Sequence, residues 1–154
     1  METAIFGAGC FWGVEEAFRQ LPGVLKTEVG YEGGHTQNPT YRDVCSHTTG
    51  HSEVVRVEFD PSKVSYETLL DTFWEEHDPT QLNRQGPDVG DQYRSVIFTT
   101  TDAQREKALA SLEKERPKHH RPIVTQVVPA ETFWPAEDYH QQYLAKRGQS
   151  SCRL

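Results

Sequence analysis

The order of strand-like and helix-like patterns is the feature that most limits the folds open to this chain. Segments with alternating apolar residues, typical of strands, are interleaved with segments whose apolar residues recur every three or four positions, typical of helices. The expected strands are 3–6, 24–31, 53–59, 93–99 and 123–129, and the expected helices are 10–21, 65–77, 102–115 and 136–147. This β-α-β-β-α-β order with appended elements predicts an α+β fold: a mixed, largely antiparallel sheet with packed helices and a split β-α-β (ferredoxin-like) core.

Two long polar stretches separate these elements. Residues 35–52 and 78–92 are rich in glycine, proline and small polar residues, so both are expected to be loops. Loops of this length in a compact domain are usually functional or mobile. The chain has 154 residues and no clear linker. We therefore expect a single domain over residues 1–147 and a flexible C-terminal tail over residues 148–154.

Charge and cysteine content narrow the classes of function. The chain has 16 basic and 23 acidic residues, a formal net charge of −7, and no run of Lys or Arg, which argues against a nucleic-acid partner. The first residues lack the pattern of a secretory signal and the apolar runs are short, so we expect a cytoplasmic protein without a membrane span. Three cysteines in such a chain favour catalytic, redox or metal roles over a disulfide framework.

Cys10 lies between glycines, where an expected strand turns into a helix. The unpaired N–H groups and the positive end of the helix dipole favour the thiolate there, which indicates a nucleophile. The alternative is a small buried side chain that packs against Phe6. Phe11 and Trp12 follow directly, and adjacent helical positions point about 100° apart. At least one of these rings is therefore expected near the thiol, where it can hold an apolar group.

Glu53 is a second candidate for a chemical role. It shares strand parity with Val55, Val57 and Phe59, so alternation points its carboxyl toward the apolar side. Burial disfavours the charged form and raises the pKa, which allows a carboxyl to act as a general acid near neutral pH. If the strand begins one residue later, Glu53 is instead a solvated loop carboxylate, and the pattern alone leaves both alternatives open.

Further candidates lie in the loops and the tail. Tyr41, Asp88 and Tyr93 stand in or at the ends of the two loops, where their side chains can orient a polar substrate atom. Cys152 stands in the tail with little to pack against, which suits a resolving thiol on a mobile tether.

Two other classes of function remain open from the residues alone. Cys45, His47 and His51 could form a metal-binding module, although their spacing is unlike that of familiar zinc sites. Alternatively, Cys10 could pair with His51 or His140 as a cysteine hydrolase. The histidines in polar segments, His119, His120 and His140, are expected to be solvent exposed.

The sequence resembles the A-type peptide methionine sulfoxide reductases over nearly its whole length. The likeness begins with Gly9-Cys10-Phe11-Trp12-Gly13. The other matching blocks, in the order of that family, are Gly30-Tyr31 with Gly33-Gly34, Asn38-Pro39-Thr40-Tyr41, Val44-Cys45-Ser46, Gly50-His51 with Glu53, Phe59-Asp60-Pro61, His77-Asp78-Pro79-Thr80, Asn83-Arg84-Gln85-Gly86 with Asp88 and Gly90, Gln92-Tyr93-Arg94-Ser95, Phe133-Trp134 with Ala136-Glu137, and Tyr139-His140-Gln141. Such a series is highly specific. The resemblance implies the family's α+β fold and reduction of the S epimer of methionine sulfoxide, free or in proteins.

The resemblance also implies a role for each matching residue. Cys10 corresponds to the attacking thiolate and Glu53 to the acid that protonates the sulfoxide oxygen. Tyr41 and Tyr93 correspond to the hydroxyls that hold this oxygen. The remaining matches bind the substrate: Phe11 and Trp12 around its S-methyl group, and Asp88 through water and backbone.

The implied cycle is thiol based. Cys10 becomes a sulfenic acid, Cys152 condenses with it to an intramolecular disulfide, and a thioredoxin-like dithiol reopens that bond. No metal and no organic cofactor is expected. The expected partners are oxidised proteins and free methionine sulfoxide as substrates and a thioredoxin-like reductant, and the chain is expected to be a monomer.

Overall fold

The computed structural model describes residues 1–147 of the chain, and the sheet is its central element. The sheet has the strand order β7-β6-β1-β3-β2-β8. Its strands are β1 (Glu2–Ala8), β2 (Val24–Glu32), β3 (Ser52–Phe59), β6 (Ser95–Thr99), β7 (Gln126–Pro129) and β8 (Trp134–Pro135). All neighbours pair antiparallel except β6 and β7, which are parallel. The sheet is therefore mixed and largely antiparallel.

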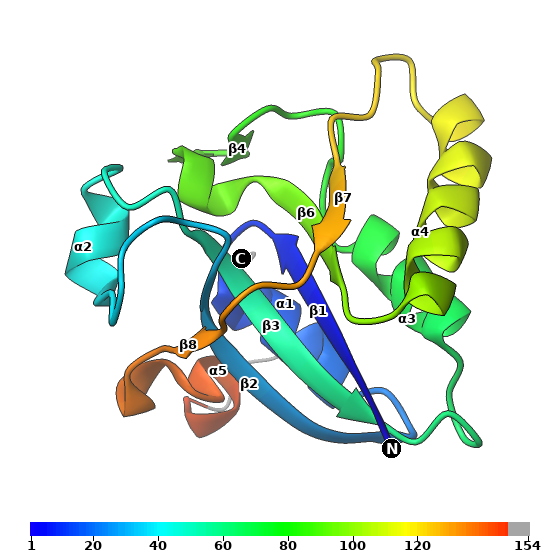
Figure 1. The fold of residues 1–154 in the computed structure, drawn as a ribbon, viewed down its shortest axis with the longest axis horizontal. Coiled ribbons are helices and arrows are strands. Elements are labelled where there is room, and N and C mark those ends of the chain that lie inside the picture. Colours follow the sequence, from blue (N-terminus) through cyan, green and yellow to red (C-terminus); the bar gives the residue numbers. More distant parts are fainter. Residues whose placement is uncertain (148–154) are drawn as a thin grey trace.

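The helices pack against this sheet and against one another. They are α1 (Phe11–Arg19), α2 (Tyr41–Cys45), α3 (Tyr66–Glu75), α4 (Asp102–Glu115) and α5 (Tyr143–Lys146). Helix α1 connects β1 to β2 and α3 connects β3 to β6, and both contribute to one core on the same face of the sheet. In Figure 1, α1 lies behind the strands and α3 lies to the right of β1. The order β6-β1-β3-β2 around these two crossovers is the split β-α-β arrangement, so the expected fold class is confirmed.

Burial of apolar side chains fixes this arrangement. The larger core lies between the sheet and the two crossover helices, where the ring of Phe6 on β1 stacks on Phe18 of α1 with centroids 5.0 Å apart. A smaller cluster covers the opposite face, where Val54 and Phe98 of the sheet pack with Phe133 from the segment between β7 and β8. That segment crosses in front of the strands in Figure 1. The central strands β1, β3 and β6 thus contribute side chains to a core on each face of the sheet.

Three expected segments differ from the structure. The expected loop 35–52 contains α2, which begins at a capping box between Thr40 and Asp43. The expected loop 78–92 contains a two-stranded hairpin of β4 (Arg84–Gln85) and β5 (Asp88–Val89), followed by the single turn η1 (Asp91–Tyr93). The expected helix 136–147 is broken into η3 (Asp138–His140) and α5, because Gln142 adopts a left-handed backbone with φ 49°.

No helix among residues 1–147 has the length and apolar content that crossing a membrane requires.

Candidate active site

Cys10 stands at the junction of β1 and α1. It is the N-cap residue of α1, so N–H groups of the first helical turn lie around it, and its side chain is half-buried. Gly9 makes the turn with φ 96°, and a Cβ atom there would lie 2.9 Å from Cγ of Gln85. Only glycine meets both conditions. The backbone therefore places Cys10 at the positive end of a nine-residue helix, where a thiolate is stabilised.

Glu53 lies beneath this helix start. It is the second residue of β3 and is only 1% exposed, so the structure matches the buried alternative rather than the solvated one. Its Oε1 accepts a hydrogen bond from the backbone N–H of Phe11 at 3.3 Å, and its Oε2 has no partner among residues 1–147. Burial raises the pKa of Glu53 to about 8, the negative charge of Asp88 adds to the rise, and the Phe11 bond opposes it. The carboxyl is therefore protonated at neutral pH.

Two tyrosine hydroxyls share the surroundings of Glu53. Tyr41 begins α2 and Tyr93 ends η1, so they come from the two loop regions. Burial raises the pKa of each, and the charge of Glu53 is the next cause in both cases. Asp88 and Cys10 also raise the pKa of Tyr93. Both phenols therefore keep their protons and can donate hydrogen bonds to an oxygen atom near Glu53 and Cys10.

An aromatic group lies beside these polar residues. Phe11 is 1% exposed, and its ring centroid lies 6.4 Å from that of Tyr41. Trp12 is half-buried and stacks on Tyr143 of α5, with centroids 3.8 Å apart and ring planes 12° apart. The indole Nε1–H donates to Nδ1 of His140 at 2.9 Å. Trp12 is therefore held both through a ring face and through its polar edge.

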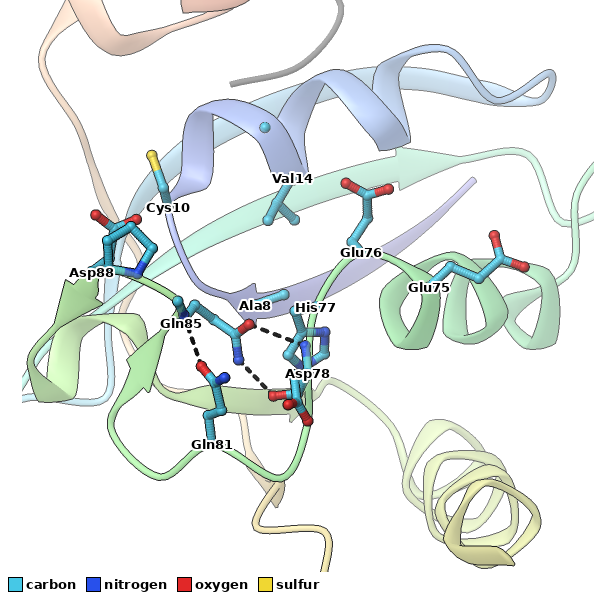
Figure 2. A pocket seen from close by; sticks show the side chains of 13 residues that line it. Ala8, Cys10, Val14, Glu75, Glu76, His77, Asp78, Gln81, Gln85 and Asp88 are labelled. Carbon is cyan, nitrogen blue, oxygen red and sulfur yellow. Dashed lines mark hydrogen bonds between the residues drawn. The ribbon is translucent and has the colours of Figure 1, made fainter. Parts of the chain in front are cut away.

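A cleft opens next to Cys10. Its volume is about 680 Å³, and it lies between α1, the end of α3 and the hairpin of β4 and β5. Figure 2 shows Cys10 and Asp88 at one end and Glu75 and Glu76 at the other, with Val14 of α1 between them. Small and apolar residues of β1 and α1 line one side, Asp78 and Gln85 lie on the other, and carboxylates stand at both ends. The cleft can therefore take an extended chain that reaches the Cys10 sulfur.

Comparison with known proteins decides the family. The family model described as "Peptide methionine sulfoxide reductase" matches residues 2–154. The chain belongs to the peptide methionine sulfoxide reductase family. The resemblance of its motifs to this family is thus confirmed, and with it the expectation of a methionine sulfoxide reductase.

Individual reductases of the family are similar over almost the whole chain. The peptide methionine sulfoxide reductase MsrA of Methanoculleus marisnigri is 62% identical, over 99% of this chain and 94% of the relative. The crystal structure of Mxr1 from Saccharomyces cerevisiae in reduced form has a TM-score of 0.91 and 35% identity, over 96% of this chain and 86% of that one. The structure of methionine sulfoxide reductase A of Corynebacterium diphtheriae has a TM-score of 0.93 and 42% identity, over 99% of this chain and 77% of that one. Mxr1 has also been solved in complex with Trx2, in a form that gives a TM-score of 0.66 and 24% identity over 92% of this chain.

The structure brings most of the expected site residues of the reductase together. Electrostatic contacts or hydrogen bonds link Cys10, Glu53, Asp88 and both tyrosines, and Phe11 donates to Glu53. Trp12 belongs to the same ring cluster as Phe11, through His140. Cys152, the expected resolving cysteine, lies outside the described residues.

Two further residues contact the candidate site, and no role in the reductase was expected for either of them. Glu137 accepts hydrogen bonds from the Tyr31 hydroxyl at 3.0 Å and from the backbone N–H of Tyr41 at 3.1 Å. His140 was expected to be exposed, and this is wrong: it is 1% exposed, because η3 turns it inward among the site's rings. The one available signal was the matching block of residues 133–141, which contains both residues in a stretch of mixed aromatic and polar character.

The geometry gives no support to the two alternative classes. Within residues 1–147 no three side chains of His, Cys, Asp or Glu gather as metal ligands, so Cys45, His47 and His51 form no such group. His51 uses Nδ1 to accept from the Gly34 N–H and Nε2 to donate to the Thr36 carbonyl. His140 uses Nδ1 as the acceptor for Trp12. Neither imidazole keeps a nitrogen lone pair available to take a proton from Cys10, as a hydrolase requires.

Proposed function

We propose that the chain reduces the S epimer of methionine sulfoxide with Cys10 as the nucleophile and Glu53 as the acid. The observation that carries this proposal is the buried, protonated Glu53, which hydrogen bonds to the residue next to Cys10. A sulfoxide needs a thiolate for its sulfur and a proton for its oxygen. These two groups meet at one helix start.

In the proposed step, the Cys10 thiolate attacks the sulfoxide sulfur and Glu53 gives its proton to the oxygen. The oxygen, with that proton, passes to Cys10, and methionine leaves. Cys10 is oxidised by two electrons to a sulfenic acid, and the substrate sulfur is reduced by two. Tyr41 and Tyr93 hold the oxygen by donating hydrogen bonds that strengthen as negative charge develops on it.

The rest of the substrate side chain is assigned to the neighbouring residues. Phe11 and Trp12 surround the S-methyl group, because an apolar wall favours the methyl over the oxygen on that side. Asp88 binds the substrate at the Cys10 end of the cleft. Its charge also helps to keep Glu53 protonated until the oxygen arrives.

Completion of the cycle is assigned to Cys152. Its thiol condenses with the Cys10 sulfenic acid, which forms a disulfide and releases water. A dithiol then reduces this disulfide by thiol–disulfide exchange: the dithiol becomes oxidised, and Cys10 and Cys152 return to free thiols. A thioredoxin-like protein is the proposed reductant, and the existence of the Mxr1 complex with Trx2 supports this choice.

For protein substrates, the proposal places the chain that flanks the oxidised methionine in the cleft beside Cys10. The small residues Ala8 and Gly13 leave room for a backbone, and Glu75 and Glu76 at the far end favour basic side chains. Free methionine sulfoxide has no such flank and does not reach these two carboxylates.

We further propose that residues 1–147 act as a single catalytic domain, that residues 148–154 carry the resolving cysteine, and that the protein works as a monomer. The cytoplasm is the proposed compartment, because each turnover consumes a dithiol and such reductants are maintained there.

Trapping the intermediate tests the assigned roles. The Cys152→Ser variant is mixed with one equivalent of a peptide S-sulfoxide, and dimedone is added to capture sulfenic acid. Mass analysis is expected to find the adduct on Cys10 in this variant and a Cys10–Cys152 disulfide in the wild type. An adduct on Cys45, or a disulfide that persists without Cys152, would contradict the assignment.

A further inference from the structure

Two side chains, those of His47 and Arg94, connect the two loop regions that supply the tyrosine hydroxyls of the site. His47 follows α2, which begins at Tyr41, and its ring Nδ1–H donates to Oε1 of Gln92 in η1 at 2.9 Å. Arg94, just after η1, donates from Nη1 to a backbone carbonyl before β3 at 3.1 Å. Tyr93 stands between Gln92 and Arg94 in the sequence. These bonds therefore determine how Tyr93 lies relative to Tyr41.

The backbone of His47 is unusual for a residue with a side chain. His47 has φ 63° and follows the C-cap residue of α2, so it stands where helices most often end in glycine. Glycine takes this left-handed conformation without a penalty, whereas a residue with a Cβ atom does not. The side chain at this place is therefore kept at a cost, and its bond to Gln92 is a contact that glycine cannot make.

The bond from His47 fixes which way the Gln92 amide faces. Gln92 is only 2% exposed, and its Oε1 faces Nδ1 of His47. Its NH₂ group therefore points away from His47, and Gln92 hydrogen bonds to the Cys45 thiol, as does the Tyr41 hydroxyl. The polar chain thus runs from His47 through Gln92 and Cys45 to Tyr41, one of the two hydroxyls assigned to the sulfoxide oxygen.

The ring of His47 also packs against the turn that precedes Tyr93. A Cβ atom at Gly90 would overlap with Oε1 of Gln92 and would lie 2.5 Å from Cε1 of His47. The carbonyl of Gly90 accepts a hydrogen bond from the backbone N–H of Tyr93 at 3.1 Å, which closes the single turn η1. His47 therefore contacts both the Gln92 side chain and the backbone turn that leads into Tyr93.

We propose that His47 is a positioning residue that holds the turn carrying Tyr93 against the helix carrying Tyr41, so that both hydroxyls meet one sulfoxide oxygen. This inference rests on the proposed function, in which these hydroxyls hold that oxygen. His47 acts through Gln92 and Gly90 rather than on the substrate. Because hydrogen bonds to developing charge act mainly in the transition state, loss of this alignment lowers kcat more than it raises KM.

The test separates the alignment from the stability of the fold. His47→Gly removes the imidazole bond and at the same time relieves the left-handed backbone, so it is expected to fold with little change in stability. His47→Asn keeps an N–H donor at the place of Nδ1, and asparagine adopts left-handed backbone more readily than most residues. Denaturant unfolding of each variant is measured beside kcat and KM for a peptide S-sulfoxide.

His47→Gly is expected to lower kcat about five- to tenfold and to leave KM within about twofold, because a displaced donor binds the developing charge less well. His47→Asn is expected to keep kcat within about twofold of the wild type. In a Tyr93→Phe background, His47→Gly is expected to lower kcat by less than about twofold more, since the hydroxyl that it positions is absent.

Asn38→Gly is the matched control. Asn38 lies in the same loop region, is exposed and also has a left-handed backbone, with φ 49°. The substitution makes the same change of backbone freedom away from Gln92, and it is expected to keep the wild-type kcat.

A wild-type kcat in His47→Gly would overturn the inference, and so would an equal loss in His47→Asn, an equal loss in Asn38→Gly, or an undiminished loss in the Tyr93→Phe background. If His47→Gly does not fold, His47→Asn and His47→Asp make the same comparison, since the two side chains have the same shape and only the amide donates. A wild type that reduces neither epimer would refute the proposed function instead, so the two failures are distinguishable.

Discussion

The carboxyl of Glu53 accepts a hydrogen bond at 3.3 Å from the backbone N–H of Phe11, the residue that follows Cys10. This bond connects β3 to the start of α1 and brings the proposed acid to the proposed nucleophile. It uses only one oxygen of Glu53, so the other is left for the substrate.

Replacing Glu53 with Gln removes the acid and keeps the shape of the side chain. We expect kcat for the S-sulfoxide to fall by about 10² to 10⁴, because proton transfer by a positioned side chain contributes on that scale. In the wild type, kcat/KM is expected to decline above a pH of about 8, where Glu53 loses its proton. A Glu53→Gln variant with activity within threefold of the wild type, or with the same alkaline decline, would contradict the assignment.

The two buried carboxyls with raised pKa values predict how stability depends on pH. The pKa of Glu53 is raised to about 8 and that of Glu32 to about 7, both mainly by burial, from an ordinary value of 4.5. Between pH 4.5 and these values the folded state keeps protons that the unfolded state releases. This contribution to stability is therefore complete below pH 4.5 and is lost as the pH rises through 7 and 8. Each group lowers the free energy of unfolding by about 1.4 kcal/mol per pH unit in this window.

Denaturant unfolding at several pH values between 5 and 7 measures this slope. Glu53→Gln and Glu32→Gln are each expected to remove about half of the slope that the two groups produce together. If both variants keep the wild-type slope, the two carboxyls do not carry the pH dependence.

The hydroxyls of Tyr41 and Tyr93 are expected to contribute separately to the reaction. Tyr41→Phe and Tyr93→Phe should each lower kcat about tenfold to a hundredfold, the range for losing a hydrogen bond to developing charge. Tyr139→Phe is the matched control, because Tyr139 is 59% exposed and its hydroxyl donates a hydrogen bond to Glu137. Equal rates for all three variants and the wild type would show that neither tyrosine holds the oxygen.

The cleft predicts a preference for basic flanking residues. Peptides with Lys beside the sulfoxide should have a KM about three to ten times lower than the same peptides with Glu, at low ionic strength, where surface charges are least screened. Glu75→Lys should abolish this preference and leave kcat/KM for free methionine sulfoxide unchanged. Glu113→Lys on α4 is the control, since Glu113 is exposed and does not line the cleft. A preference that survives Glu75→Lys and a double Glu75→Lys, Glu76→Lys variant would exclude the cleft as its source.

Local patterns were enough to predict the framework of the fold. The helix at 102–115 agrees with α4 at both ends, because Thr101 caps it and Pro117 follows closely. The region 136–147 was expected to be one helix, and the left-handed backbone at Gln142 breaks it. That break depends on the bonds from Gln142 to Glu15, which lies 127 residues earlier. No local pattern contains such a contact.

The same limit applies to the site. Strand alternation, a local property, left a buried and a solvated Glu53 both open, and the structure has the buried alternative. The positions of Glu137 and His140 depend on contacts with residues far away in sequence. His140 accepts from Trp12, 128 residues earlier, and Glu137 accepts from Tyr41, 96 residues earlier. Their polar neighbours in sequence indicated solvent, whereas tertiary packing buries His140 among rings.

A single-turnover count tests the central assignment most directly. The reduced protein is incubated with each epimer of a peptide methionine sulfoxide without added reductant, and the methionine formed and the thiols lost per chain are counted. We predict about one methionine from the S epimer and the loss of two thiols, with no reaction in Cys10→Ser. No methionine from either epimer, or full turnover in Cys10→Ser, would contradict Cys10 as the nucleophile of this reductase.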